Sequence, residues 1–310
     1  MNALYGIRCS DFYKLCLSVF EEIRFPVRFS HFSKKMYGNF VHTFLIVYRE
    51  RLNVSYRRFT EIAHENNLQR MLCIKRIPHF TTLHKFMQKI DKRIFEKMVR
   101  ACRALLNLKN IEASMDGTGF SNTNPSHYYA KRIDGVMPRN YTKTVFLADN
   151  KSKLILNVRT HSDNRNETLD FIPLVQELTR VLRGVLADKA YDSMGNRAFC
   201  RERGIDVQIP FRRYPQARAQ EFGTPSKRAR LAREFDSLAY RRRALIESVN
   251  SAIKRTLGGY VCARTAQAQQ KEVTLKALAY NLEVIGRRIK LWLFINLGGF
   301  LHRPARRKLY

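Results

Sequence analysis

The clearest indication of the fold is the stretch Ile111-Glu112-Ala113-Ser114-Met115-Asp116. Apolar and polar residues alternate along it, which is typical of a β-strand that buries one face. Gly117 follows directly, and an aspartate before a glycine is ordinary turn chemistry. The stretch therefore predicts a strand that carries an aspartate at its end.

The residues that follow predict the rest of a sheet. Two β-rich runs, residues 144–148 and 153–159, are separated by a polar hairpin turn at residues 149–152. The next expected element is a helix over 166–183, which ends at Gly184. Its inward face would consist of Leu169, Ile172, Val175, Leu178 and Leu182. A strand at 185–187, a helix at 193–203 and a strand at 205–209 follow. This order predicts an α/β fold with a five-stranded sheet flanked by helices.

Residues 1–108 predict a helical region. Apolar residues recur at helical spacing from Phe12 to Ile23, and Pro26 ends that element. Ser55 is the expected N-cap of a second helix, and Thr81 or Thr82 opens a third. We therefore divide the chain into a basic helical region (1–108), an α/β domain (109–290) and a basic C-terminal tail (291–310).

The helical region has two competing interpretations. Two short helices with a loop between them carry basic side chains, as in a DNA-binding helix-turn-helix, namely Arg57, Arg58, Arg70, Lys75 and Arg76. An ordinary helical packing unit explains them equally well, since Lys and Arg are common on outward faces.

The charge of the chain points to a polyanionic partner. The formal net charge is +31, from 57 Lys and Arg against 26 Asp and Glu. Residues 1–110 contribute +13 and residues 201–310 contribute +16, whereas residues 111–200 contribute only +2. Two basic flanks around a carboxylate-bearing centre favour nucleic acid over a uniformly basic surface. A membrane surface is the weaker alternative, because no basic amphipathic helix with a broad aromatic face is evident.

Cysteine spacing and hydropathy indicate a soluble intracellular protein, and together with the basic charge they lead us to expect a cytoplasmic, nucleoid-associated one. The six cysteines contain no Cys-x-x-Cys pair, which argues against a zinc site or a disulfide framework. No apolar run is long enough to span a bilayer, and no signal-peptide pattern opens the chain.

Three carboxylates are placed where they can meet. Asp116 ends the first strand, Asp188 follows the fourth, and Glu247 lies within a helix after the sheet. Read as one helix at about 100° per residue, residues 240–257 present Tyr240, Arg243, Glu247 and Lys254 within roughly a 60° arc. The apolar residues, including Leu238 and Leu245, then face the other side, and Arg242 falls in that apolar arc and must extend to water.

These residue types suit phosphodiester chemistry. Two aspartates and a glutamate supply only hard oxygen ligands, which favour Mg²⁺, with Mn²⁺ as a substitute, over zinc. Two such ions activate a nucleophile and stabilise the leaving oxygen of an in-line displacement. The guanidinium and ammonium groups on the same face can bind phosphates.

The combination resembles the DDE transposases of bacterial and archaeal insertion sequences, whose catalytic core has a ribonuclease-H-like fold. The resemblance covers about residues 109–285 and is carried by Met115-Asp116-Gly117-Thr118, by residues 187–192, and by the spacing Tyr240-x2-Arg243-x3-Glu247-x6-Lys254, which matches the YREK signature of insertion-sequence families four and five. The segment 210–239 is too short for the β-rich subdomain that some relatives insert before the glutamate.

The resemblance implies a function for each residue. Asp116, Asp188 and Glu247 are then the catalytic, metal-binding triad, while Arg243, Lys254 and Tyr240 contact the DNA. It also implies an enzyme that binds terminal inverted repeats, cuts DNA with two Mg²⁺ ions, joins the ends to target DNA, and works as a homodimer on paired ends. The remaining alternatives are another ribonuclease-H-like nuclease and a catalytically silent, transposase-derived DNA-binding protein.

Overall fold

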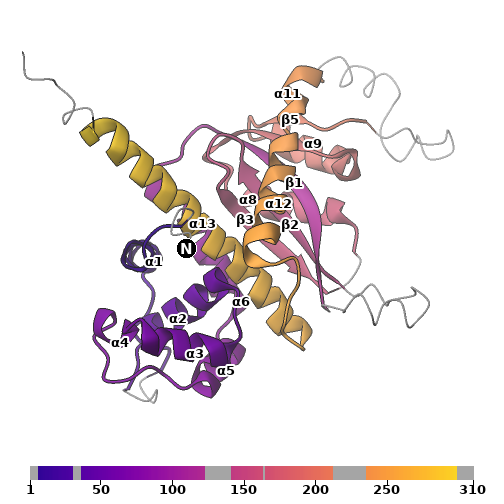
Figure 1. Cartoon of the computed structure of the whole chain (residues 1–310). Coiled ribbons are helices and arrows are strands. Elements are labelled where there is room, and N and C mark those ends of the chain that lie inside the picture. The colour runs from indigo at the N-terminus through magenta and orange to yellow at the C-terminus, as the bar shows by residue number, and fades with distance from the viewer. Residues whose placement is uncertain (1–5, 31–35, 123–140, 163–164, 212–234, 299–310) are drawn as a thin grey trace, which may run out of the picture.

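The structure is a computed structural model that describes residues 6–30, 36–122, 141–162, 165–211 and 235–298. A helical N-terminal region lies beside an α/β domain, and one long helix, α13, runs between the two (Figure 1). Within the described part of the chain, no helix combines the length and the apolar character needed to cross a membrane.

The sheet has five strands in the order β3-β2-β1-β4-β5. Its first three strands along the chain pair antiparallel as a meander, and β4 and β5 then add parallel to β1 on its other side. The bounds are β1 Ile111–Ser121, β2 Tyr141–Asp149, β3 Ile155–His161, β4 Leu182–Ala187 and β5 Asp206–Gln208. This mixed sheet confirms the predicted α/β class, and it is the architecture that the ribonuclease-H-like resemblance implies.

The predicted hairpin turn between β2 and β3 is confirmed. The backbone N–H of Ser152 donates to the Asp149 carboxylate at 2.7 Å, so the side chain closes the turn. Lys153 takes a positive φ of 61°, which lets the chain reverse within a few residues.

Helices cover both faces of the sheet because its two faces carry different apolar sets. Phe120, Phe146 and Val158 pack with α12 and α13, whereas Met115 and Val145 pack with α8. The bounds of the elements that follow β3 are η2 Glu167–Asp170, α8 Phe171–Gln176, η3 Lys189–Tyr191, α9 Met194–Arg201, α11 Ser237–Arg241, α12 Ala244–Leu257 and α13 Ala266–Gly298. In Figure 1, α12 crosses the sheet in front of β1.

The predicted helix over residues 166–183 is wrong in its second half. Helix α8 ends at Gln176, and Leu182, Arg183 and Gly184 belong to β4 instead. Pairing on both sides, with β1 and β5, buries this apolar run more completely than a helix face would. Leu169, expected to face inward, is 67% exposed.

The N-terminal region is helical, as predicted. Ser55 caps its helix by accepting a hydrogen bond from the N–H of Arg58 at 3.2 Å. The third predicted helix begins at Phe80, capped by His79, just before the expected threonines. The bounds are α1 Cys9–Glu22, α2 Asn39–Leu52, α3 Tyr56–Glu65, α4 Leu68–Met71, α5 Phe80–Lys89, α6 Lys92–Ala101 and η1 Ala104–Leu106.

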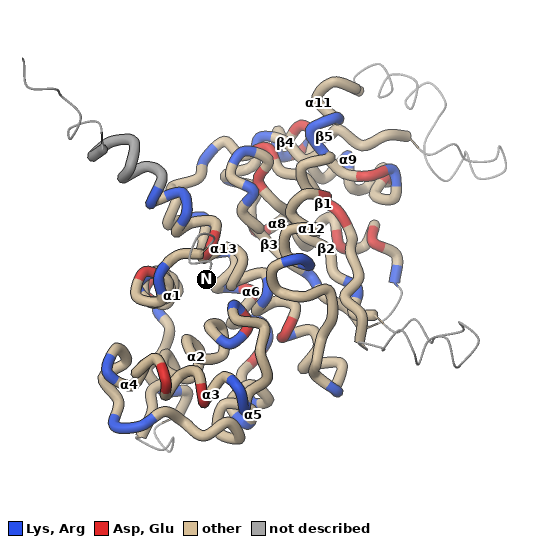
Figure 2. The backbone as a smooth tube through the Cα atoms, in the orientation of Figure 1, with Lys and Arg blue, Asp and Glu red and all other residues tan. Residues whose placement is uncertain are grey.

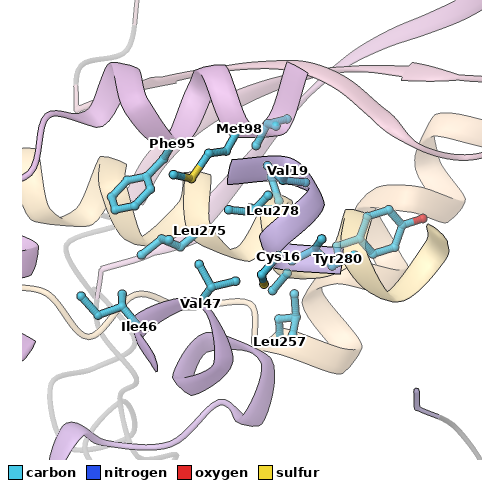
Figure 3. Packing of buried hydrophobic residues seen from close by; sticks show 14 of the residues in the cluster. Cys16, Val19, Ile46, Val47, Phe95, Met98, Leu257, Leu275, Leu278 and Tyr280 are labelled. Atoms are coloured by element: carbon cyan, nitrogen blue, oxygen red, sulfur yellow. The ribbon is translucent and has the colours of Figure 1, made fainter. Parts of the chain in front are cut away.

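Helix α13 joins the helical region to the sheet through one apolar core. Figure 3 shows Leu275 and Leu278 of α13 among side chains from α1, α2, α6 and α12, such as Phe95 and Leu257. The backbone of α13 continues to Gly298, past the predicted limit at residue 290, and the rest of the predicted tail, 299–310, lies outside the described residues. This core therefore holds α12 against the sheet.

A buried ionic cluster crosses the same core. The side chain of Lys276 on α13 is 1% exposed, and its Nζ lies 3.6 Å from the Glu50 carboxylate on α2. The same ammonium donates to the carbonyl oxygen of Leu257, the last residue of α12, while Glu50 also pairs with Arg49. Burial lowers the pKa of Lys276, and Glu272 opposes that shift. The cluster thereby links α2, α12 and α13.

Replacing Lys276 by methionine should lower the free energy of unfolding by about 3–5 kcal/mol, because Glu50 then keeps a buried charge without this partner. Urea unfolding measures the change. The control is Lys14→Met on the exposed face of α1, which should stay within about 0.5 kcal/mol of wild type. Equal losses for the two variants would contradict the role of the cluster.

Candidate active site

The two predicted aspartates come together because β1 and β4 are neighbours. Met115 pairs with Ala187 in the parallel register, and Asp116 and Asp188 are the next residues on the two strands. Asp188 directly follows β4 and caps η3, with its Oδ1 accepting the N–H of Ala190 at 3.4 Å. The prediction that the first strand ends at Asp116 is wrong, because β1 continues to Ser121 and Gly117 pairs with Val145 on β2 instead of forming a turn. The two carboxylates, 72 positions apart in sequence, lie on neighbouring segments at the point where β4 ends.

Helix α12 brings its polar side chains onto Asp116. Asn250 Nδ2 donates to Asp116 Oδ2 at 3.0 Å. Arg243 Nη1 lies 3.8 Å from Asp116 Oδ1, and its Nη2 donates to Glu247 Oε1 at 2.7 Å. Arg243 therefore connects the carboxylates of Asp116 and Glu247. Acidic positions of the sheet and basic positions of the helices around α12 lie close together in Figure 2.

The helix that carries the predicted signature is interrupted. Tyr240 belongs to α11, and residues 242–243 form a tighter link before α12, with the N–H of Leu245 bonded to the carbonyl of Arg242 at 3.0 Å. The link still keeps Tyr240 near the site, with the Arg243 guanidinium 5.8 Å from the centre of its ring. The assumption of a single continuous helix was wrong.

Two side chains near the interruption differ from prediction for the same reason. Leu238, expected in the apolar arc, is 67% exposed. Arg242 does not lie along the core but makes a bidentate ion pair with Glu112 on β1, at 2.7 and 2.8 Å. Both predictions assumed one continuous helix, which the turn at residues 242–243 interrupts.

Lys254 lies about one turn beyond Asn250 on the same helix. Its ammonium is 5.7 Å from the centre of the Phe120 ring on β1. Burial lowers the pKa of Lys254, and the negative charge of Asp116 opposes that shift. Lys254 is therefore a half-buried cation in the electrostatic range of the aspartate.

A further carboxylate, Glu167, was missed by the sequence analysis. It receives an ion pair from Lys143 at 3.0 Å and a hydrogen bond from the Tyr191 hydroxyl at 3.0 Å. A Cβ added to Gly117 would lie 2.5 Å from the Glu167 carboxylate, so only glycine permits this approach. The glycine after Asp116 was the available signal, although we interpreted it as turn chemistry.

Negative charge is concentrated around Asp116. Burial raises the pKa of Asp116 to about 6; Arg243 opposes this shift, while Glu167, Glu247 and Asp188 add to it. A carboxylate that is this crowded by other carboxylates gains most from a neighbouring cation.

The carboxylates are not arranged as a ready metal cluster. Among the described residues, no three His, Cys, Asp or Glu side chains stand close enough together to hold a metal ion. Arg243 accounts for part of this, because it pairs with Glu247. The donor chemistry nevertheless fits a hard divalent cation, since every candidate ligand is a carboxylate oxygen, and burial together with the neighbouring carboxylates raises the pKa of Asp116.

The site belongs to an α/β domain in which Asp116 lies on β1 and Asp188 directly follows the neighbouring β4, covered by a helix that adds a glutamate and basic residues. Residues 109–282 match the family described as Transposase DDE domain. Because this match covers more than half of the chain, the protein belongs to that family of transposases.

Two solved structures are similar to the chain. One is a cryo-EM structure of a piggyBac transposase synaptic complex with hairpin DNA, with 9% identity, a TM-score of 0.42 and coverage of 98% of this chain and 84% of that one. The other is a crystal structure of a pre-cleavage Mos1 transpososome, with 13% identity, a TM-score of 0.20 and coverage of 87% and 85%. Comparison with curated proteins gives no match.

Replacing Asp116 by asparagine should change how stability depends on pH. A carboxyl whose pKa is raised to about 6 by folding destabilises the folded state as pH rises from about 4 through 6. In the absence of divalent ions the variant should match wild type near pH 4 and exceed it by up to about 3 kcal/mol above pH 7.

Urea unfolding across this pH range measures the difference. The control is Glu202→Gln, which removes a carboxylate whose side chain is 69% exposed. A constant offset between Asp116→Asn and wild type at every pH would show that folding does not shift this carboxyl.

Proposed function

We propose that the protein is a DNA transposase that binds the terminal inverted repeats of its own insertion sequence, cleaves DNA strands with divalent metal ions and transfers the ends to target DNA. The observation that carries the proposal is the convergence on Asp116: Asp188 adjoins it in the sheet, and Arg243 connects it to Glu247. The family match supports the same conclusion, because DDE transposases normally use divalent metals.

Asp116 and Asp188 would hold the metal, with Glu247 as third ligand once its carboxylate leaves Arg243. Bound Mg²⁺ ions, two in our proposal and replaceable by Mn²⁺, would supply a lowered pKa for the attacking water or hydroxyl and neutralise charge on the leaving oxygen. Asn250 orients Asp116 through its amide at 3.0 Å. Arg243, released by Glu247, and Lys254 bind phosphate oxygens, and Tyr240 contacts the same strand.

We assign DNA binding also to the helical region. Helices α3 and α5 pack together, and the chain between them contains the short helix α4. Arg57 and Arg58 begin α3. The piggyBac structure is a synaptic complex on hairpin DNA, and we propose that this chain likewise acts on paired DNA ends as a homodimer.

The second candidate is a catalytically silent DNA-binding protein derived from a transposase. One observation favours it: Arg243 pairs with both Asp116 and Glu247, so these carboxylates are already neutralised in part. Strand cleavage that depends on divalent ions distinguishes the two functions, because only the transposase cleaves DNA. Strand transfer into a second duplex separates the transposase from other ribonuclease-H-like nucleases.

Asp116→Asn and Glu247→Gln should each abolish strand cleavage while leaving DNA binding intact, since an amide cannot replace the charge of a metal ligand. The assay uses Mg²⁺ and a duplex carrying the DNA that flanks the gene on one side. Glu202→Gln, an exposed carboxylate on the far side of β5, is the matched control and should cleave normally. Cleavage by both active-site variants at the wild-type rate would show that Asp116 and Glu247 are not catalytic residues.

Lys254→Gln should weaken binding of the same duplex and reduce the slope of log affinity against log salt by about 0.9, the value for one phosphate contact. Arg255→Gln provides the control, because Arg255 is the adjacent residue and is exposed on the helix. If the two variants share the same salt dependence, Lys254 contacts no phosphate.

A further inference from the structure

A basic cleft lies along β3, the edge strand beyond β2. It has a volume of about 830 Å³ and is bounded by α6, β3, the segment that leads into α8, and Gln270 of α13. Five basic and two acidic side chains are among its lining residues: Lys92, Arg93, Arg100, Arg159, Arg165, Glu96 and Glu177. We call this surface the β3 cleft.

Buried groups hold the basic side chains of the β3 cleft in place. Asp170 is 1% exposed, and its Oδ1 lies 3.2 Å from Arg159 Nε and 2.8 Å from His161 Nε2. The Arg159 side chain, 39% exposed, is thus anchored at one end and open to solvent at the other. Lys92 contacts Thr160 Oγ1 at 3.3 Å and Gln270 Oε1 at 3.1 Å, which fixes α6 against the strand.

The β3 cleft lies two strands away from the candidate active site in the sheet. Asp116 pairs with Phe146 on β2, and Phe146 pairs with Val158 on β3. With neighbouring strands about 4.8 Å apart, β3 lies about 10 Å from Asp116. Lys143 bridges the two surfaces, with its ammonium bonded to Glu167 at 3.0 Å and to the carbonyl of Arg165 at 2.9 Å.

This spacing matches a continuous strand of DNA. Measured along the axis of a DNA duplex, a distance of about 10 Å corresponds to roughly three base pairs, at about 3.4 Å of axis per nucleotide of one strand. A small anion would need only one or two of the five basic groups, whereas a polyanion can engage them in succession. The polar lining offers little to an apolar partner.

We propose that the β3 cleft binds the phosphate backbone of duplex DNA a few nucleotides away from the phosphate held at Asp116. The proposal rests on the proposed transposase function, because it uses the same DNA. In this proposal α6 contacts the DNA directly, so the helical region and the α/β domain bind the same duplex.

The test removes two charges from the cleft without touching Asp170 or the candidate catalytic residues. The variant is Arg93→Gln with Arg100→Gln, both on α6. The matched control is Arg201→Gln with Arg203→Gln, exposed residues at the end of α9, beside β5 at the opposite edge of the sheet. The double lysine variant, Arg93→Lys with Arg100→Lys, keeps both charges and tests for damage to the fold.

The affinity for a fluorescent, mixed-sequence duplex of about 30 base pairs is measured at several NaCl concentrations, and the slope of log affinity against log salt is compared. The glutamine variant of the cleft should reduce the slope by about 1.8, for two lost phosphate contacts, while the lysine variant and the α9 control keep the wild-type slope. An unchanged slope, or an equal reduction in the α9 control, would overturn the proposal.

Strand cleavage by the same wild-type preparation separates this proposal from the proposed function. If wild type cleaves DNA and the cleft variant keeps its slope, the cleft proposal alone fails. If wild type binds DNA but does not cleave it, and the cleft variant reduces the slope of log affinity against log salt, DNA binding by the β3 cleft is supported and transposase activity is not.

Discussion

The parallel pairing of β1 with β4 places the acidic residues of the candidate site. Because Met115 lies opposite Ala187, the residue that follows each of them is an aspartate, and backbone hydrogen bonds hold Asp116 and Asp188 together at the end of the β1–β4 pairing. Side-chain rotation alone cannot separate them widely. Every other polar group of the candidate site is organised around this fixed pair.

Helix α12 can act on that pair only because it is held firmly over the sheet. Its buried stripe, Ile246, Val249, Ile253 and Leu257, packs into the core shared with the helical region. The ammonium of Lys276 donates to the carbonyl of the last residue of α12 and pairs with Glu50 on α2, which fixes that end of the helix. Arg243, Glu247 and Asn250 then project from a rigid element, which favours precise placement of charges around Asp116.

The alternation of apolar and polar residues from Ile111 to Asp116 is a local signal, so the first half of β1 could be predicted, whereas its continuation to Ser121 depends on pairing with β2. The break at residues 242–243 could not be predicted, because Arg242 leaves the helical face to pair with Glu112, which lies 130 positions away in the sequence. Likewise, the strand at Leu182 arises from pairing with β1. Glu167 reaches the site only through the space above Gly117, a contact that no sequence spacing reveals.

In our proposal Asp116 and Asp188 hold a divalent ion next to a DNA strand. Binding of Mn²⁺ to the DNA-bound protein can be followed by electron paramagnetic resonance. Wild type should bind the ion, and Asp116→Asn and Asp188→Asn should each weaken that binding at least tenfold, a loss of about 1.4 kcal/mol. Equal Mn²⁺ affinity in wild type and both variants would contradict the account.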